Sequence, residues 1–148
     1  MRGFWLLVHV IGFTLWLGGG IATMVAGITA KGFAPADRLS AYRVIGAIQR
    51  LLVAPGAIAV VLSGLFLVGP YMRAVPLWLG IMMPAGILGA IGAVAISVPT
   101  AAKLARLEPQ GGQLPGAFDR LRKRQIVAAT LAGSLGLLAL FAGTVLRG

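Results

Sequence analysis

The only histidine of this 148-residue chain, His9, lies within a long apolar run near the start of the sequence. An ionisable side chain at membrane depth is costly, so it raises the question of a function. Imidazole ligates haem iron or copper, and it carries a proton near neutral pH. Alternatively, it hydrogen-bonds a carbonyl group or water, since it lies only about five residues, roughly 7 Å, inside the run. The residues alone slightly favour this structural role over haem ligation.

Methionines supply a partner for the histidine at the same depth. Met82 and Met83 lie five to six residues into the third apolar run, which starts on the same side of the membrane as the first. A histidine and a methionine form a ligand set for haem iron, and a thioether also suits Cu(I). Methionine is equally a common packing residue in apolar helices. We therefore take His9 and Met82 as candidate metal ligands and Met83 as a further candidate cofactor contact.

A helical wheel at about 100° per residue groups His9 with aromatic and small residues of the first run. One arc of the wheel contains Trp5, His9, Gly12, Phe13, Trp16, Gly20, Thr23 and Gly27. The opposite arc is aliphatic and suits lipid. Glycine allows a neighbouring backbone or a flat ligand to come close. We predict that the first arc faces the protein interior, with Gly12, Trp16 and Gly20 beside His9 in a cofactor site.

Catalytic chemistry has little support in the residue types. The three acidic residues, Asp37, Glu108 and Asp119, all lie between the apolar runs, and there are no cysteines. The sequence therefore lacks a carboxylate pair within a run, a nucleophile–base arrangement and a zinc motif. It also excludes disulfides, iron–sulfur clusters and thiolate metal sites. The composition argues against an enzyme, and we assign no catalytic residue.

The elements that hold these residues are four long apolar segments. Hydrophobic residues make up 59% of the chain and charged residues 11%, and the mean hydropathy is +0.96. A small soluble domain cannot bury so much apolar surface. A membrane-crossing helix needs about 20 apolar residues, and four segments qualify: 4–30, 51–69, 77–98 and 126–146. The first is longer than the apolar part of a signal peptide, so we expect it to be retained. The sequence predicts one all-α domain, an integral membrane four-helix bundle.

The basic residues predict how the bundle is oriented. The segments after spans one and three contain ten of the thirteen cations: Lys31, Arg38, Arg43, Arg50, Lys103, Arg106, Arg120, Arg122, Lys123 and Arg124. The opposite side has only Arg2, Arg73 and Arg147. Because basic loops stay in the cytoplasm, both longer loops are predicted to be cytoplasmic and both termini to face outward. Because the cations lie between the apolar spans, where basic residues orient membrane helices and meet anionic lipid, we expect no nucleic-acid partner.

The two basic segments are expected to contact the membrane surface. Arg120, Arg122, Lys123 and Arg124 are predicted to bind anionic lipid headgroups and thereby anchor the topology. Residues 35–50 mix apolar and charged side chains, which predicts an interfacial helix leading into the second span.

Three prolines lie within or at the end of the predicted spans. Pro55 and Pro84 each remove a backbone hydrogen bond and favour a kink, and Pro99 lies at the end of the third span.

Several short motifs resemble a known family. The spacing of one histidine, one tryptophan and three glycines is similar to the first helix of small CopD-like membrane proteins (His9, Gly12, Trp16, Gly18 and Gly19). More distantly, it resembles the HemJ-type protoporphyrinogen oxidases. The stretch "VAPGAIAVVLSGLFLV" is similar to the second helix of the group, and "VPTAAKLARL" to the exit from its third. The resemblance covers nearly the whole chain.

The resemblance implies a histidine-bearing four-helix bundle in the bacterial inner (cytoplasmic) membrane, which handles haem b or copper. His9 is the only position onto which a ligand of the family can be carried. The HemJ type pairs its histidine with a lysine close to the membrane, whereas Lys31, Lys103 and Lys123 lie in the basic loops. Oxidation of a porphyrinogen is therefore not expected. Copper-transporting members also contain more metal ligands than this chain.

Three functions remain open from the sequence. The first is haem b binding, with His9 as axial ligand and a methionine, or His9 of a second copy in a homodimer, as the other. The second is a non-catalytic accessory or assembly role in a larger membrane complex, which suits the small size and the glycine-rich faces. The third is copper handling through His9 and the outer methionines.

Overall fold

The computed structural model describes residues 1–71 and 73–148. The described residues form helices and loops without a β-strand. Short 3-10 or π-helical turns, labelled η, extend or join the α-helices. The elements in chain order are α1 (Arg2–Thr29), η1 (Ala30–Gly32), α2 (Pro35–Ile48), η2 (Gln49–Val53), α3 (Ala54–Val68), η3 (Gly69–Tyr71), α4 (Leu77–Gly92), η4 (Ala93–Ser97), α5 (Val98–Ala105) and α6 (Ala117–Thr144).

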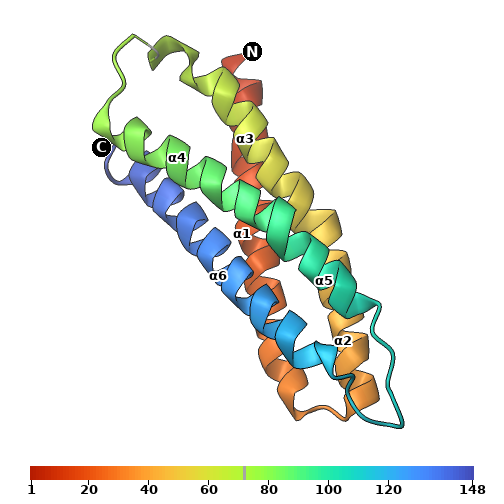
Figure 1. The fold of residues 1–148 in the computed structure, drawn as a ribbon. Coiled ribbons are helices and arrows are strands. Elements are labelled where there is room, and N and C mark those ends of the chain that lie inside the picture. The colour runs from red at the N-terminus through yellow and green to blue at the C-terminus, as the bar shows by residue number, and fades with distance from the viewer. Residues whose placement is uncertain (72) are drawn as a thin grey trace.

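These elements build four long helices that run up and down (Figure 1). Each is long and apolar enough to cross a membrane, which confirms the predicted number of helices that could do so. The N- and C-termini lie at one end, which we call the terminal end, together with the connection between α3 and α4. The two longer loops lie at the opposite end, which we call the basic end. Helix α1 packs mainly against α3, and α4 against α6.

Small residues allow α1 and α3 to approach closely. A Cβ atom at Gly56 would lie 2.7 Å from the backbone nitrogen of Trp16, and one at Gly12 would lie 2.9 Å from the carbonyl oxygen of Gly56. Backbones at this separation tolerate only glycine, as in other tightly packed membrane helices. The outer surface of the bundle is covered by exposed aliphatic side chains, including Val10 and Ile21. The predicted division of α1 into an aliphatic outer face and a mixed inner face is therefore present.

Two π-helical turns accommodate prolines inside the long helices. Pro55 and Pro99 lie two residues after η2 and η4 respectively. A proline lacks the backbone N–H and clashes with the carbonyl four residues earlier. In both π turns the hydrogen bonds span five residues, from Ala54 to Gln49 and from Val98 to Ala93. This wider spacing lets the helices continue, so the third helix extends past Pro99 to Ala105.

Residues 35–50 do not form an interfacial helix, and that prediction is wrong. They belong to one continuous helix, Pro35–Tyr71, that runs along the bundle. Leu39, Tyr42 and Ile45 are buried against α5 and the start of α6, in a cluster with Leu104 and Phe118, whereas Val44 is exposed. Most of the stripe that looked suited to a membrane surface is therefore covered by protein.

Candidate functional site

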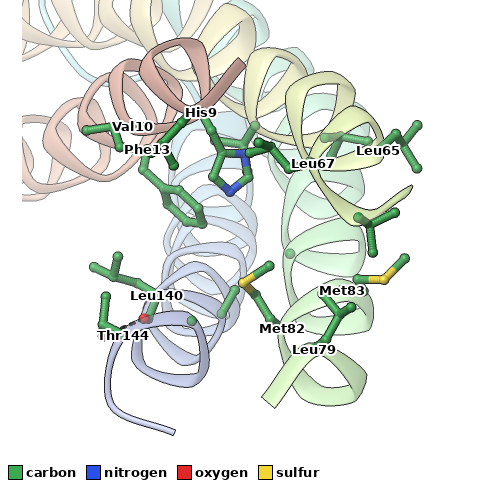
Figure 2. A pocket seen from close by; sticks show the side chains of 18 of the residues that line it. His9, Val10, Phe13, Leu65, Leu67, Leu79, Met82, Met83, Leu140 and Thr144 are labelled. Carbon is green, nitrogen blue, oxygen red and sulfur yellow. Dashed lines mark hydrogen bonds between the residues drawn. The ribbon is translucent and has the colours of Figure 1, made fainter. Parts of the chain in front are cut away.

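A cavity of about 870 Å³ lies between the four long helices at the terminal end. Its walls are mainly apolar side chains of α1, α3, α4 and α6, and Figure 2 shows how several of them face the enclosed space. His9 is the one ionisable group in the middle of these walls. Pockets for small molecules and cofactors measure about 300 to 1,000 Å³ and combine apolar walls with few polar groups. The cavity has the size and the lining of such a pocket.

His9 is held in place by a buried serine on the neighbouring helix. The Nδ1 atom of His9 lies 2.9 Å from the Oγ atom of Ser63, which is fully buried. Ser63 has a single hydroxyl hydrogen, and the carbonyl oxygens of Ala59 and Val60 both accept from it. With that hydrogen directed at a carbonyl oxygen, the Ser63 oxygen accepts from Nδ1–H of His9, and we assign this tautomer to the imidazole. The assignment leaves the lone pair of the imidazole on Nε2.

The environment of the imidazole directs Nε2 away from α3. Gly64 makes room for the ring, because a Cβ atom there would lie 3.3 Å from Cε1 of His9. The Phe13 ring packs edge-to-face on the imidazole with centroids 5.2 Å apart. Figure 2 shows the imidazole projecting from α1 into the cavity. Metal-binding histidines are typically fixed in this way, by a hydrogen bond from the nitrogen that does not bind the metal.

The methionines lie on the wall opposite His9. Met82 and Met83 both line the cavity, and Figure 2 shows the Met82 thioether directed toward the same space as the imidazole. Met82 rests against α6, where a Cβ atom at Gly143 would lie 2.7 Å from its Sδ atom. The fold therefore brings His9 and both methionines to the walls of one cavity. Of the remaining methionines considered as outer ligands, Met1 is exposed and Met72 lies outside the described residues.

Three other predicted cofactor contacts, Gly12, Trp16 and Gly20, are not among the described residues that line the cavity. Gly12 contacts the α3 backbone, and Trp16 is almost fully buried against Gly89 and Gly136. A Cβ atom at Gly20 would meet nothing within 4 Å, whereas one at Gly19 would lie 2.8 Å from Val53. On a wheel at about 100° per residue, the buried Gly12, Trp16, Gly19 and Thr23 fall within roughly 60° of one another. The buried stripe is therefore centred to one side of the predicted arc, and it includes Gly19 in place of Gly20.

Two arginines, one from near each end of the sequence, lie at the mouth of the cavity beside two aromatic side chains. An Nη2–H group of Arg2 donates a 3.4 Å hydrogen bond to the Tyr71 hydroxyl. The Cζ atom of Arg147 lies 5.6 Å from the centroid of the Trp78 ring. Tyr71 and Trp78 pack edge-to-face on each other, and all four side chains line the cavity. Sequence reasoning treated these arginines only as a charge count, because nothing in the sequence shows that the start of α1 and the end of α6 border one cavity.

A second polar region, toward the basic end, was not predicted. Nε2–H of Gln125 donates to Ser97 Oγ at 3.0 Å, Ser97 donates to Oε1 of Gln49 at 3.1 Å, and Nε2–H of Gln49 donates to Thr23 Oγ1 at 3.3 Å. Thr23 in turn donates to the carbonyl of Gly20. This chain, which we call the amide chain, joins all four long helices. Both glutamines stand beside arginine or a basic run in the sequence, just outside the predicted spans 51–69 and 126–146.

The basic residues assigned to lipid headgroups lie at the start of α6. Arg120, Lys123 and Arg124 are exposed, and Arg122 is half-buried. The neighbouring Arg38 places its guanidinium 5.0 Å from the centroid of the Phe118 ring. Three of these four predicted contacts are therefore available to an outside partner at the basic end.

Comparisons of the chain with protein families, with curated proteins and with solved structures found no match.

Proposed function

We propose that this protein is a haem-binding integral membrane protein, in which Nε2 of His9 is an axial ligand of haem b. The observation that carries the proposal is the Ser63–His9 hydrogen bond, which leaves the Nε2 lone pair directed into an apolar cavity. The resemblance of the first span to CopD-like proteins supports the same cofactor. The proposal goes no further than cofactor binding, because no residue for substrate chemistry lies beside the site.

The donor set fits haem better than a bare metal ion. Among the described residues, no three His, Cys, Asp or Glu side chains lie close enough to hold a metal ion together. His9 and Met82 offer one imidazole and one thioether, the axial pair found in cytochromes of the c type. Haem supplies its own four equatorial nitrogen ligands, whereas a copper ion takes them from the protein. Bound haem would supply one-electron chemistry at this position.

We further propose that the terminal end faces the outside of a bacterial cytoplasmic membrane. The charge asymmetry supports this orientation, because ten of thirteen cations belong to the basic end. The exposed Arg120, Lys123 and Arg124 would then contact anionic headgroups of the inner leaflet. The exposed aliphatic side chains between the two ends would face the lipid tails.

The absorbance spectrum of the purified protein tests the haem proposal. Protein made in cells supplied with haem and extracted in detergent should show a Soret band, and His9→Ala should abolish or shift it. Thr14→Ala is the matched control, because Thr14 lines the same cavity from the same helix while its hydroxyl bonds only the Val10 carbonyl. A spectrum without a Soret band, or a band unchanged in His9→Ala, contradicts the proposal. Stoichiometric copper in such haem-free protein would favour the copper alternative.

A further inference from the structure

The arginines at the cavity mouth have no acidic side chain near them. The three acidic residues lie at the basic end: Asp37 in the first turn of α2, Glu108 after α5 and Asp119 in the first turn of α6. In the described part of the chain the one ion pair is between Arg43 and Glu108, also at that end. Arg2 and Arg147 therefore place two guanidinium groups that form no ion pair at the entrance of an apolar cavity.

The placement of these two arginines is selective. Three cations belong to the terminal end, but only Arg2 and Arg147 line the cavity, while Arg73 is exposed outside it. Arg2 is tethered through the Tyr71 hydroxyl, and Arg147 rests on the Trp78 ring. A guanidinium has five N–H donors and stacks on aromatic faces without using them. Each arginine thus keeps donors for a carboxylate, which it can bind through two parallel hydrogen bonds.

The walls of the cavity below the mouth indicate the chemical character of the rest of the ligand. Between the mouth and His9 the walls are formed by aliphatic, aromatic and thioether side chains, such as Leu79, Leu140 and Met83. An apolar body would be stabilised there, whereas a small hydrophilic anion would lose its hydration without compensation. A charged group at one end and an apolar body at the other define an amphipathic carboxylate.

We propose that Arg2 and Arg147 bind the carboxylate groups of an amphipathic ligand whose apolar body occupies the cavity. The inference deepens the proposed function: for haem b, the carboxylates are the two propionates and the apolar body is the porphyrin. The same chemistry is offered by a fatty acid from the surrounding membrane. The two sources differ in that only haem places iron beside His9.

Titration of the purified protein with haem b and with its dimethyl ester tests this assignment. The ester keeps the iron and the porphyrin and removes only the two charges. Because a hydrogen bond to a charged group contributes about 1.5–3 kcal/mol, we expect haem b to bind roughly tenfold or more tightly than the ester. Arg2→Gln and Arg147→Gln should each weaken the binding of haem b by a similar factor and leave the binding of the ester unchanged. Arg73→Gln is the matched control and should change neither.

A second arm separates this inference from the haem proposal. A fatty acid brominated along its chain quenches the fluorescence of a nearby tryptophan, and Trp78 lies at the mouth. If haem does not bind but the fatty acid quenches more strongly than its methyl ester, and the arginine variants remove the difference, the inference holds without the haem function. Equal binding of acid and ester in both arms overturns it. The inference is also overturned if Arg73→Gln weakens binding as much as the other two variants do.

Discussion

The two halves of the bundle treat their buried polar groups in opposite ways. Toward the basic end, the amide chain joins side chains that are at most 7% exposed, and each bonds another member, although Oε1 of Gln125 has no partner among the described residues. Toward the terminal end, the helices enclose a cavity, and His9 has one side-chain partner. Polar groups in a low-dielectric interior stabilise a fold when they satisfy one another. A group that keeps a free lone pair beside open space is instead available to a ligand.

The boundary between the halves is formed by one large side chain. Trp16 is 2% exposed, and its ring fills the space beside Gly89 and Gly136 of α4 and α6. Above it, the α1–α3 pair and the α4–α6 pair diverge toward the terminal end (Figure 1), and the cavity lies between them. The difference teaches that one bundle can hold its helices together in one half and leave the other half open for binding.

The largest effect on stability is expected where the helices touch backbone to backbone. A Cβ atom in Gly56→Ala would lie 2.7 Å from the Trp16 nitrogen and 2.8 Å from the Gly12 carbonyl oxygen. Backbone atoms cannot rotate away, so the variant should lose about 3 kcal/mol of stability, the upper part of the range for overpacking. Thermal unfolding in detergent measures this loss. Gly18→Ala is the control, because nothing lies within 4 Å of that position, and an equal loss there would refute the backbone contact.

An intermediate effect is expected in the amide chain. Gln49→Leu removes a member that bonds two others, Thr23 and Ser97, and leaves Ser97 without its acceptor. The expected loss is about 1–2 kcal/mol, because polar contacts between membrane helices average less than those with fully buried partners in water-soluble proteins. Gln110→Leu, in an exposed loop where the recorded bonds are made by the backbone, should leave the unfolding midpoint unchanged. If Gln49→Leu also has no effect on that midpoint, the amide chain does not stabilise the basic half.

The smallest effect on stability, but a clear one on the ligand, is expected at Ser63. Ser63→Ala removes the acceptor that fixes the His9 tautomer, and should cost about 1 kcal/mol or less. The same change should shift the Soret band or weaken haem binding, because the imidazole is then free to turn. A spectrum and an affinity identical to those of the unmodified protein would show that the orientation of His9 does not depend on Ser63. Gln49→Leu should show the reverse pattern, with reduced stability and an unchanged spectrum.

Sequence reasoning reached the parts of this protein that follow from local composition. The four apolar segments needed only length and hydropathy, and the placement of His9 and Met82 near the same end of the bundle needed only a count from each helix start. The prediction for residues 35–50 was wrong because an amphipathic stripe looks the same whether lipid headgroups or another helix covers it. The shift from Gly20 to Gly19 arose because the predicted arc was centred toward His9 and Phe13, whereas the buried stripe is centred nearer Gly12 and Thr23 on the same wheel.

The sequence by itself determined the number of helices, the side on which the cations gather, and the single imidazole available for chemistry. Only the tertiary structure decided which nitrogen of His9 is free, because that depends on a serine 54 positions away. It also decided that Arg2 and Arg147, near opposite ends of the chain, share one cavity. Contacts between residues so distant in sequence arise when helices assemble, and no local pattern of residues encodes them.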